Sequence, residues 1–293
     1  MARIIRKAFI AFGIIAALLI IVGVFATLRE PKFPAVVMPN PNGYNELLKA
    51  SNMIEMPSWS NPKKPSQAEM AEFVTKNAEA LKLARRGLHQ KCRVPLESSE
   101  GQIVVRAPGV PLFENLAEVL LDEGKVAEPE NRHADAADSY VTAIRVGQEI
   151  MRGGMLLEAM EGSSIERAGL GSLERLVPQL AASECRQIII ALDSADTNRE
   201  TVQNIVHQEK VWNRKMYGWR YYMHPVVNAQ ARHRASAITE QSDRRRKLMI
   251  KLAAQAFEME HGAKPKIVND LVPTYLKAVP KDAFTGRDMT YPP

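Results

Sequence analysis

The chain has few cysteines and few aromatic residues. Its 293 residues include two cysteines, Cys92 and Cys185, and aromatic side chains make up 6% of the sequence. No Cys-x-x-Cys pair occurs, which excludes a zinc ribbon and a thioredoxin-type redox motif. In an oxidising envelope the two cysteines could pair, closing a long loop, but we favour two free, buried thiols.

Long alternating runs of β-branched residues are also missing, which argues against a β architecture. One short segment, residues 102–106, could form a strand, but it has no partner in the sequence. Apolar residues recur instead at helical spacing, and the hydrophobic content of 46% is typical of a globular chain. The sequence predicts an all-α fold, an irregular multi-helix bundle of antiparallel hairpins without a repeat of fixed period.

Motifs for common chemistries are absent as well. The six histidines form neither His-Glu-x-x-His nor a His-x-x-x-His pair, and no Gly-x-Ser-x-Gly elbow or phosphate-binding loop occurs. The glycine pairs 153–154 and 169/171 are expected at helix ends. Three carboxylates, Glu158, Glu161 and Glu166, are expected on a solvated helix face. We therefore expect no metal and no cofactor, and we favour a protein that is not an enzyme.

Residues 8–28 carry no charge and form the longest apolar run of the chain. About 20 apolar residues span a bilayer as a helix, the only form that a lone span can take in lipid. Three cations precede the run and two follow it: Arg3, Arg6, Lys7, Arg29 and Lys32. The positive-inside rule then places residues 1–7 in the cytoplasm and the C-terminal domain outside the inner membrane. The alternative is a cleaved signal peptide with Val24-Phe25-Ala26 as its cleavage site.

The remainder of the chain divides into three parts. Residues 29–41 contain four prolines and indicate a stiff stalk. Residues 42–262 form the helical extracytoplasmic domain. Ser66 and Glu69 form a capping box in it, and glycine and proline end its last helix. The expected helices cover residues 42–56, 66–88, 112–121, 137–151, 156–168, 172–180, 183–192, 197–217 and 225–259. The proline-rich tail, residues 263–293, is expected to pack on the domain and bury Leu271, Leu276 and Phe284.

The tail resembles that of uncharacterised single-span envelope proteins of planctomycete-like bacteria, whose tails run Leu-Val-Pro-x-Tyr-Leu and then Val-Pro-x-Asp-Pro-Phe-x-Gly. Lys264 stands here in place of an aromatic residue and Ala283 in place of a proline. The middle stretch, residues 153–176, is similar to another part of those proteins. The resemblance implies a membrane-anchored envelope protein and carries no assigned activity. The matching residues are Gly262, Pro265, Leu271, Val272, Pro273, Tyr275, Leu276, Val279, Pro280, Asp282, Phe284, Gly286 and Tyr291.

One segment is concentrated in basic and aromatic residues. Residues 201–251 hold eleven lysines and arginines against three acidic residues, a surplus of eight, and residues 212–222 hold five aromatics. Cations among aromatic rings suit anionic lipid headgroups, an acidic protein partner or single-stranded nucleic acid, the last disfavoured for an outward-facing domain. The alternative is a set of core aromatics followed by a solvated helix face. The candidate binding residues are Trp212, Arg214, Lys215, Trp219, Arg220, Arg232, Arg234, Arg244, Arg245, Arg246 and Lys247.

These features together predict a membrane-anchored extracytoplasmic scaffold or binding module, with an envelope protein or an anionic surface as its partner. Two alternatives stay open. One is an envelope enzyme of hydrolase type, with a site that only the fold assembles. The other is a pseudopilin-like secretion component, although the Gly-Phe processing junction with its following glutamate is missing.

Overall fold

The computed structural model describes residues 2–28, 37–57, 65–99, 102–105, 111–218 and 225–292. Over this part of the chain the fold is all-α apart from one small hairpin, as the sequence predicts. The elements are α1 (Ala2–Leu28), α2 (Gly43–Met53), α3 (Gln67–Lys76), α4 (Ala78–Gly87), β1 (Leu96–Ser99), β2 (Gln102–Val105), α5 (Pro111–Ala127), α6 (His133–Met151), α7 (Leu156–Leu176), α8 (Ala182–Thr197), α9 (Val202–Tyr217) and α10 (Pro225–His261), with short 3₁₀ turns at Glu128–Glu130, Val177–Gln179 and Val268–Leu271.

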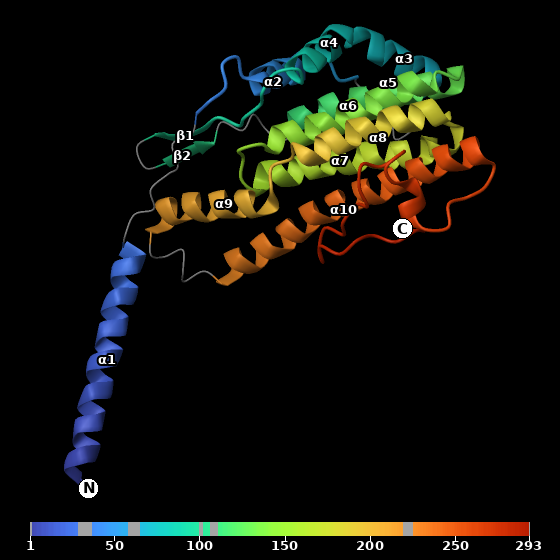
Figure 1. The fold of residues 1–293 in the computed structure, drawn as a ribbon. Coiled ribbons are helices and arrows are strands. Elements are labelled where there is room, and N and C mark those ends of the chain that lie inside the picture. Colours follow the sequence, from blue (N-terminus) through green and yellow to red (C-terminus); the bar gives the residue numbers. More distant parts are fainter. Residues whose placement is uncertain are drawn as a thin grey trace.

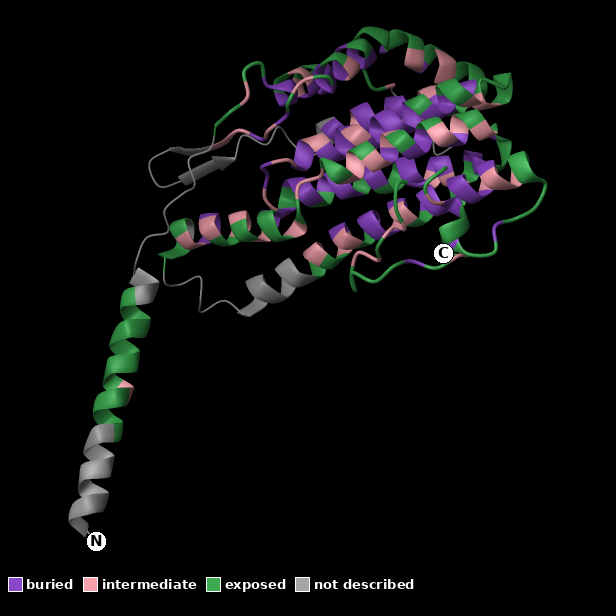
Figure 2. Cartoon of the chain, viewed as in Figure 1, coloured by how far each residue is buried: buried purple, intermediate pink, exposed green. Residues whose placement is uncertain are grey.

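Helix α6 lies at the centre of the bundle (Figure 1). It packs along α7 and against α5 and α8, while α10 runs across α7 and α8 on the opposite side from α2 to α4. Buried residues are concentrated along α5 to α8, as Figure 2 shows in purple. The central position of α6 means that its side chains face neighbours on almost every side.

The apolar interior consists of two main clusters that share α6. The first core joins α6, α7, α8, α10 and the tail, and the second core joins α2 to α6. Tyr140 and Ile144 of α6 belong to the first core, while Val146 and Ile150 of the same helix belong to the second. The two cysteines are free and buried, Cys92 in the second core and Cys185 in the first.

Close approach of α6 and α7 depends on glycines. A Cβ atom added at Gly147 would collide with the Gly162 carbonyl oxygen, one added at Gly162 would collide with the Gly147 carbonyl oxygen, and one at Gly169 would lie 2.7 Å from Ile144 Cγ1. The expectation that Gly169 and Gly171 end a helix is wrong, because α7 runs through both without a break. Gly153 does follow a helix end, with a positive φ of 70° that a residue without a Cβ adopts easily.

The predicted capping box at the start of α3 is confirmed. Ser66 Oγ accepts a hydrogen bond from the Glu69 backbone N–H at 3.3 Å, and Glu69 Oε2 accepts one from the Ser66 backbone N–H at 2.7 Å. The single helix expected over residues 66–88 is divided at Asn77 into α3 and α4. The Asn77 side chain accepts from the Glu55 backbone N–H and donates to the Phe73 carbonyl, so it ties the junction to the end of α2.

The short strand expected at residues 102–106 does have a partner. Strand β2 pairs antiparallel with β1, with Leu96 opposite Val105 and Ser99 opposite Gln102. The partner was missed because Leu-Glu-Ser-Ser lacks the β-branched and aromatic residues that mark a strand.

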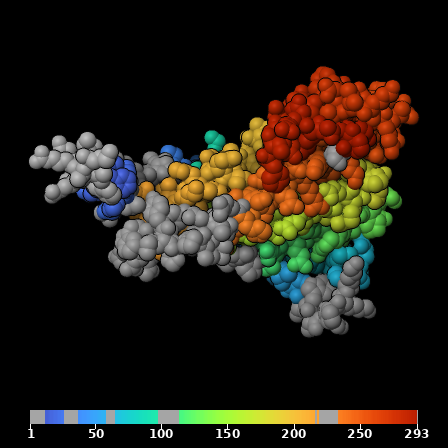
Figure 3. Space-filling model, turned by 90° about the horizontal axis from the view of Figure 1, so that it is seen from below, coloured from blue at the N-terminus to red at the C-terminus, as the bar shows by residue number. Residues whose placement is uncertain are grey.

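The tail packs on the bundle, as predicted (Figure 3). Leu271 and Leu276 are buried in the first core, which confirms two of the three expected contacts. The third is wrong, because the Phe284 side chain is 56% exposed. Met289 fills the first core from this part of the tail instead.

Helix α1 stands apart from the bundle (Figure 1). Its 27 residues reach about 40 Å at 1.5 Å per residue. Its described side chains, those of residues 12–25, are all apolar, and Phe12 and Phe25 are 73% and 75% exposed. Within the described part of the chain, no helix meets the length and hydropathy needed to cross a membrane. Residues 29–36 of the expected stalk lie outside the described residues.

Candidate functional site: a cationic cleft beside a buried ionic network

The basic run of α10 does not form an open cationic surface. Arg244 is half-buried and pairs with Glu174 of α7 at 2.6 Å, and Lys247 pairs with Asp243 of its own helix at 3.0 Å. Arg245 is 0% exposed, so its assignment to a surface patch is wrong, and so is the alternative of a solvated face at this position. Successive residues of a helix point about 100° apart, which separates these neighbouring cations.

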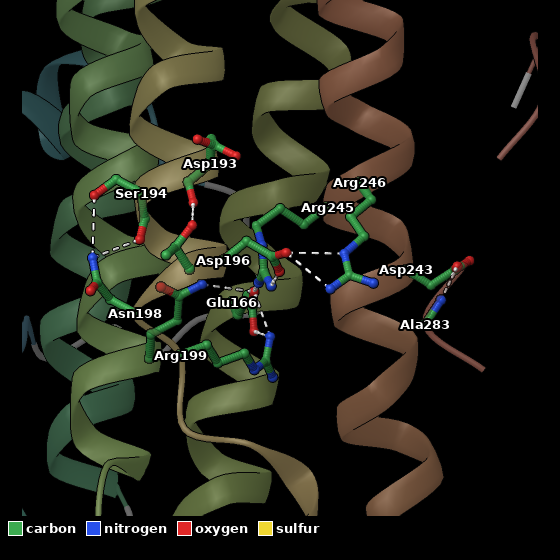
Figure 4. A network of polar contacts seen from close by, with 12 residues as sticks. Glu166, Asp193, Ser194, Asp196, Asn198, Arg199, Asp243, Arg245, Arg246 and Ala283 are labelled. Carbon is green, nitrogen blue, oxygen red and sulfur yellow. Dashed lines mark hydrogen bonds and ion pairs between the residues drawn. The ribbon is translucent and has the colours of Figure 1, made fainter. Parts of the chain in front are cut away.

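Arg245 belongs to a buried ionic network that joins α7, α8, α10, the segment after α8 and the tail (Figure 4). Its guanidinium binds Glu166 of α7 and Asp196 of α8. Arg199 pairs with Glu166 at 2.8 Å and also donates to the Ile238 carbonyl of α10. Arg246 pairs with Asp196 at 3.0 Å and donates to the Lys281 carbonyl of the tail at 2.8 Å.

Opposite charges in direct contact explain how Asp196 and Arg245 stay ionised away from water. Burial alone would raise the pKa of the Asp196 carboxyl, but Arg245 and Arg246 outweigh it and lower that pKa. Burial acts to lower the pKa of Arg245, yet Glu166 and Asp196 outweigh it and raise the pKa. Breaking such a buried pair leaves one charge without compensation, which costs several kcal/mol. The network therefore holds the bundle together rather than presenting charge to a partner.

The rest of the predicted basic-aromatic segment is only partly described. Trp212 is buried and Arg214 is half-buried, whereas Lys215 is exposed. Arg234 is half-buried on α10. Trp219, Arg220 and the side chain of Arg232 lie outside the described residues.

The three carboxylates expected on a solvated face of α7 are all buried, so that expectation is wrong. Glu166 belongs to the ionic network. Glu158 Oε2 accepts a hydrogen bond from the Met155 backbone N–H at 2.8 Å. Burial raises the pKa of Glu161 to about 8, helped by the charges of Glu114 and Glu158. Glu161 is therefore mostly protonated at neutral pH.

A separate cleft lies between α6, the end of α8 and the segment that follows α4. Its volume is about 910 Å³, within the range of small-ligand sites. Apolar side chains such as Leu88 and Val141 line it together with six charged ones: Lys91, Arg93, Asp138, Arg145, Glu149 and Arg152. We call it the cationic cleft.

The charges of the cationic cleft do not cancel. Glu149 and Arg152 neutralise each other through two hydrogen bonds of 2.8 Å. Asp138 faces Arg85, outside the cleft lining, at 3.9 Å. Lys91, Arg93 and Arg145 form no ion pair with any described residue. The lining therefore carries a positive surplus of unpaired cations.

Polar groups in the cleft wall are also incompletely bonded. Gln90 Oε1 and Arg93 Nε are buried without a hydrogen-bond partner in the described part of the chain. The hydrogen bond of Arg145 goes to the Leu88 carbonyl at 2.8 Å and uses one of its donors. Gln148 lines the cleft and donates to Glu166, so it links the cleft to the ionic network.

The cleft is suited to binding rather than to nucleophilic chemistry. The nearest thiol, Cys92, is buried, and burial together with the charge of Glu149 raises its pKa to about 12. A thiol with that pKa is protonated at neutral pH and is a poor nucleophile. No histidine is among the described residues that line the cleft.

None of the cleft cations was identified from the sequence, although α6 carried a signal. Arg145, Gln148, Glu149 and Arg152 are spaced three and four residues apart, which places a polar stripe on a helix that is otherwise buried. Arg245 had a signal too, since it lies three and seven residues before the buried Leu248 and Leu252. Lys91 and Arg93 come from a non-helical segment, and no local spacing predicts their position.

No protein-family model matches this sequence, and neither a curated protein nor a solved structure matches it.

Proposed function

We propose that the chain is a membrane-anchored, extracytoplasmic helical binding module of the bacterial envelope. The observation that carries the proposal is α1, whose residues 12–25 are all apolar and, apart from the half-buried Ala16, exposed, while the bundle has its own cores. Exposed apolar surface of this size needs a partner, and the uncharged run of residues 8–28 has the roughly 20 apolar residues that a span requires. The cations flanking residues 8–28 favour an outward-facing domain on the inner membrane, and the tail motif supports membership of the envelope family that it resembles.

The binding role draws its support from the cationic cleft. An envelope hydrolase, the first alternative, would need a general acid or base in an open cleft, typically histidine or a free carboxylate. Of the two cleft carboxylates, Glu149 is held by Arg152 and Asp138 faces Arg85 at 3.9 Å, while burial raises the pKa of the Cys92 thiol to about 12. The pseudopilin alternative would favour one helix running from the anchor into the domain. Residues 37–42 are not helical, which speaks against that architecture.

Membrane fractionation of the full-length chain in a Gram-negative bacterium tests the anchor and its orientation. We expect the chain to stay with the membranes after carbonate extraction. Protease added to intact spheroplasts should digest the bundle, because it faces outward.

The matched variant carries Leu18→Arg and Ile21→Arg, which place two charges on exposed positions of α1. Each charge near the centre of a span costs about 2.5–3.5 kcal/mol, so this variant should leave the membrane. An intact-mass measurement separates the anchor from a cleaved signal peptide, since cleavage would remove residues 1–26. Recovery of the uncleaved wild-type chain in the soluble fraction would refute the anchor.

A further inference from the structure

The cationic cleft and its chemistry go beyond the proposed anchor. We propose that this cleft binds an organic anion, with Arg93, Arg145 and Lys91 as the groups that hold its carboxylates or phosphates. The inference rests on the proposed function in one respect: it names the class of ligand that the proposed binding module takes. The cleft itself belongs to the bundle.

The first step of the argument is charge. Lys91, Arg93 and Arg145 line one cavity, and Asp138 is the one acidic residue of the described lining that is not bound to Arg152. Elsewhere in the bundle half-buried arginines find carboxylates, as Arg244 and Arg246 do at 2.6 and 3.0 Å. Three cations without carboxylate partners around a cavity of about 910 Å³ are suited to an anion from outside the chain.

The second step is the unsatisfied hydrogen bonding. Buried polar atoms in native proteins almost always have partners, and an unmet one costs about 1–3 kcal/mol. Arg93 Nε is such an atom, and its guanidinium lies beside Gly153, where an added Cβ would stand 3.0 Å from Nε. Guanidinium groups donate in a planar fork that matches carboxylate and phosphate oxygens. Because Arg93 lines the cleft, an anion bound there could accept from the guanidinium fork.

The third step is rigidity. Arg145 is held by the Leu88 carbonyl at 2.8 Å, and Gln148 in the same wall is held by Glu166. These two side chains of the wall are therefore held before a ligand binds, which lowers the side-chain order that has to be gained on binding. The apolar side chains Leu88 and Val141 give room for the carbon skeleton of the ligand.

Titration calorimetry of the full-length chain in phosphatidylcholine nanodiscs tests the inference. The probes are adipate, a flexible dicarboxylate, and pyrophosphate, with uncharged adipamide as the control. We expect adipate or pyrophosphate to bind at least tenfold more tightly than adipamide, and the binding to weaken as salt is added. Equal binding of adipate and adipamide, or none by any probe, overturns the proposal.

Variants locate the site. Arg145→Gln and Arg93→Gln should each weaken anion binding at least tenfold, as expected for loss of a charged hydrogen bond. Arg167→Gln removes an exposed cation of α7 outside the cleft and should leave binding unchanged. Lys91→Gln, at an exposed position that leaves the fold intact, should weaken binding about two- to fivefold. Anion binding that survives all three cleft substitutions would overturn the assignment.

A second set of nanodiscs identifies the source of the anion. Discs that contain phosphatidylglycerol present phosphate headgroups to the same domain. If the natural ligand is a headgroup, these discs should suppress adipate binding in the wild-type chain, whereas a soluble ligand predicts the same adipate affinity in both discs. If the chain proves not to be anchored in the membrane, the same titration is carried out in buffer. The anion site is then still tested, so a failed anchor and a failed anion site give different results.

Discussion

Alanine substitution at three consecutive arginines of α10 should give three different stabilities. Arg244 pairs with Glu174 across two half-exposed side chains, and exposed pairs contribute about 0.2–1 kcal/mol. Arg246 makes an ion pair and one backbone hydrogen bond near the surface, for which we expect a loss of about 1–3 kcal/mol. Arg245 is fully buried between Glu166 and Asp196, and breaking such a pair costs about 3–5 kcal/mol.

Thermal unfolding of the full-length chain in detergent, followed by far-UV circular dichroism, measures the difference. For a domain of this size each kcal/mol shifts Tm by about 2–4 °C, so Arg245→Ala should lower Tm by about 6–20 °C. Arg244→Ala is the matched control one residue away and should lower it by less than about 4 °C. Equal shifts for the two variants would refute the buried position of Arg245.

A double-mutant cycle then tests the partner. Glu166→Gln should destabilise the wild-type chain strongly, because it leaves Arg199 and Arg245 without their shared carboxylate. In the Arg245→Ala background the same change should cost less, with a coupling energy of at least about 1 kcal/mol. Additive effects would mean that the two side chains do not interact.

Two further predictions concern α7. Gly162→Ala should destabilise the chain by about 1–3 kcal/mol in denaturant unfolding, because the added Cβ would collide with the α6 backbone. Gly171→Ala is the control on the same helix. Its added Cβ would have the flexible end of Arg244 as its nearest neighbour, at 3.3 Å, so this variant should be more stable by up to about 1 kcal/mol. The Glu161 carboxyl has its ordinary pKa of about 4.5 in the unfolded chain and a pKa of about 8 in the folded chain. Stability should therefore fall as the pH rises through this window, by about 3–5 kcal/mol in total. Glu161→Gln should remove that loss in unfolding curves at the two ends of the window, whereas Glu79→Gln, at an exposed site, should retain it.

Local signals predicted much of the helical frame. The Ser66 capping box, the glycines after α6 and α10 and the proline-rich tail are short-range features, and they lie where the sequence indicates. The junction at Asn77 was missed because it depends on a contact with Glu55 across 22 residues. The hairpin was missed because β1 has weak strand propensity and depends on pairing with β2.

The candidate site was harder to predict, since burial reverses the usual meaning of a charged residue. A run such as Arg244 to Lys247 indicates a solvated face unless carboxylates of other helices pair with it. The partners of Arg245, Glu166 and Asp196, lie 79 and 49 residues away in the sequence, so no local pattern indicates them. The cleft cations come from α6 and from the segment after α4. Their convergence depends on how those elements pack, which no local spacing records.

The sharing of α6 between two cores has a consequence for how the chain is made. Helices α2 to α6 are synthesised before the rest of the bundle, so the second core is largely complete at that stage. The side of α6 that carries Tyr140 and Ile144 then still lacks the first-core residues that cover it. Helices α7, α8 and α10 arrive later, and Leu271 and Leu276 arrive after all of them. A half-made chain thus carries apolar surface of the kind that promotes aggregation or recruits chaperones. The tail ends this exposure, and a chain halted before residue 268 should be degraded faster than a complete one.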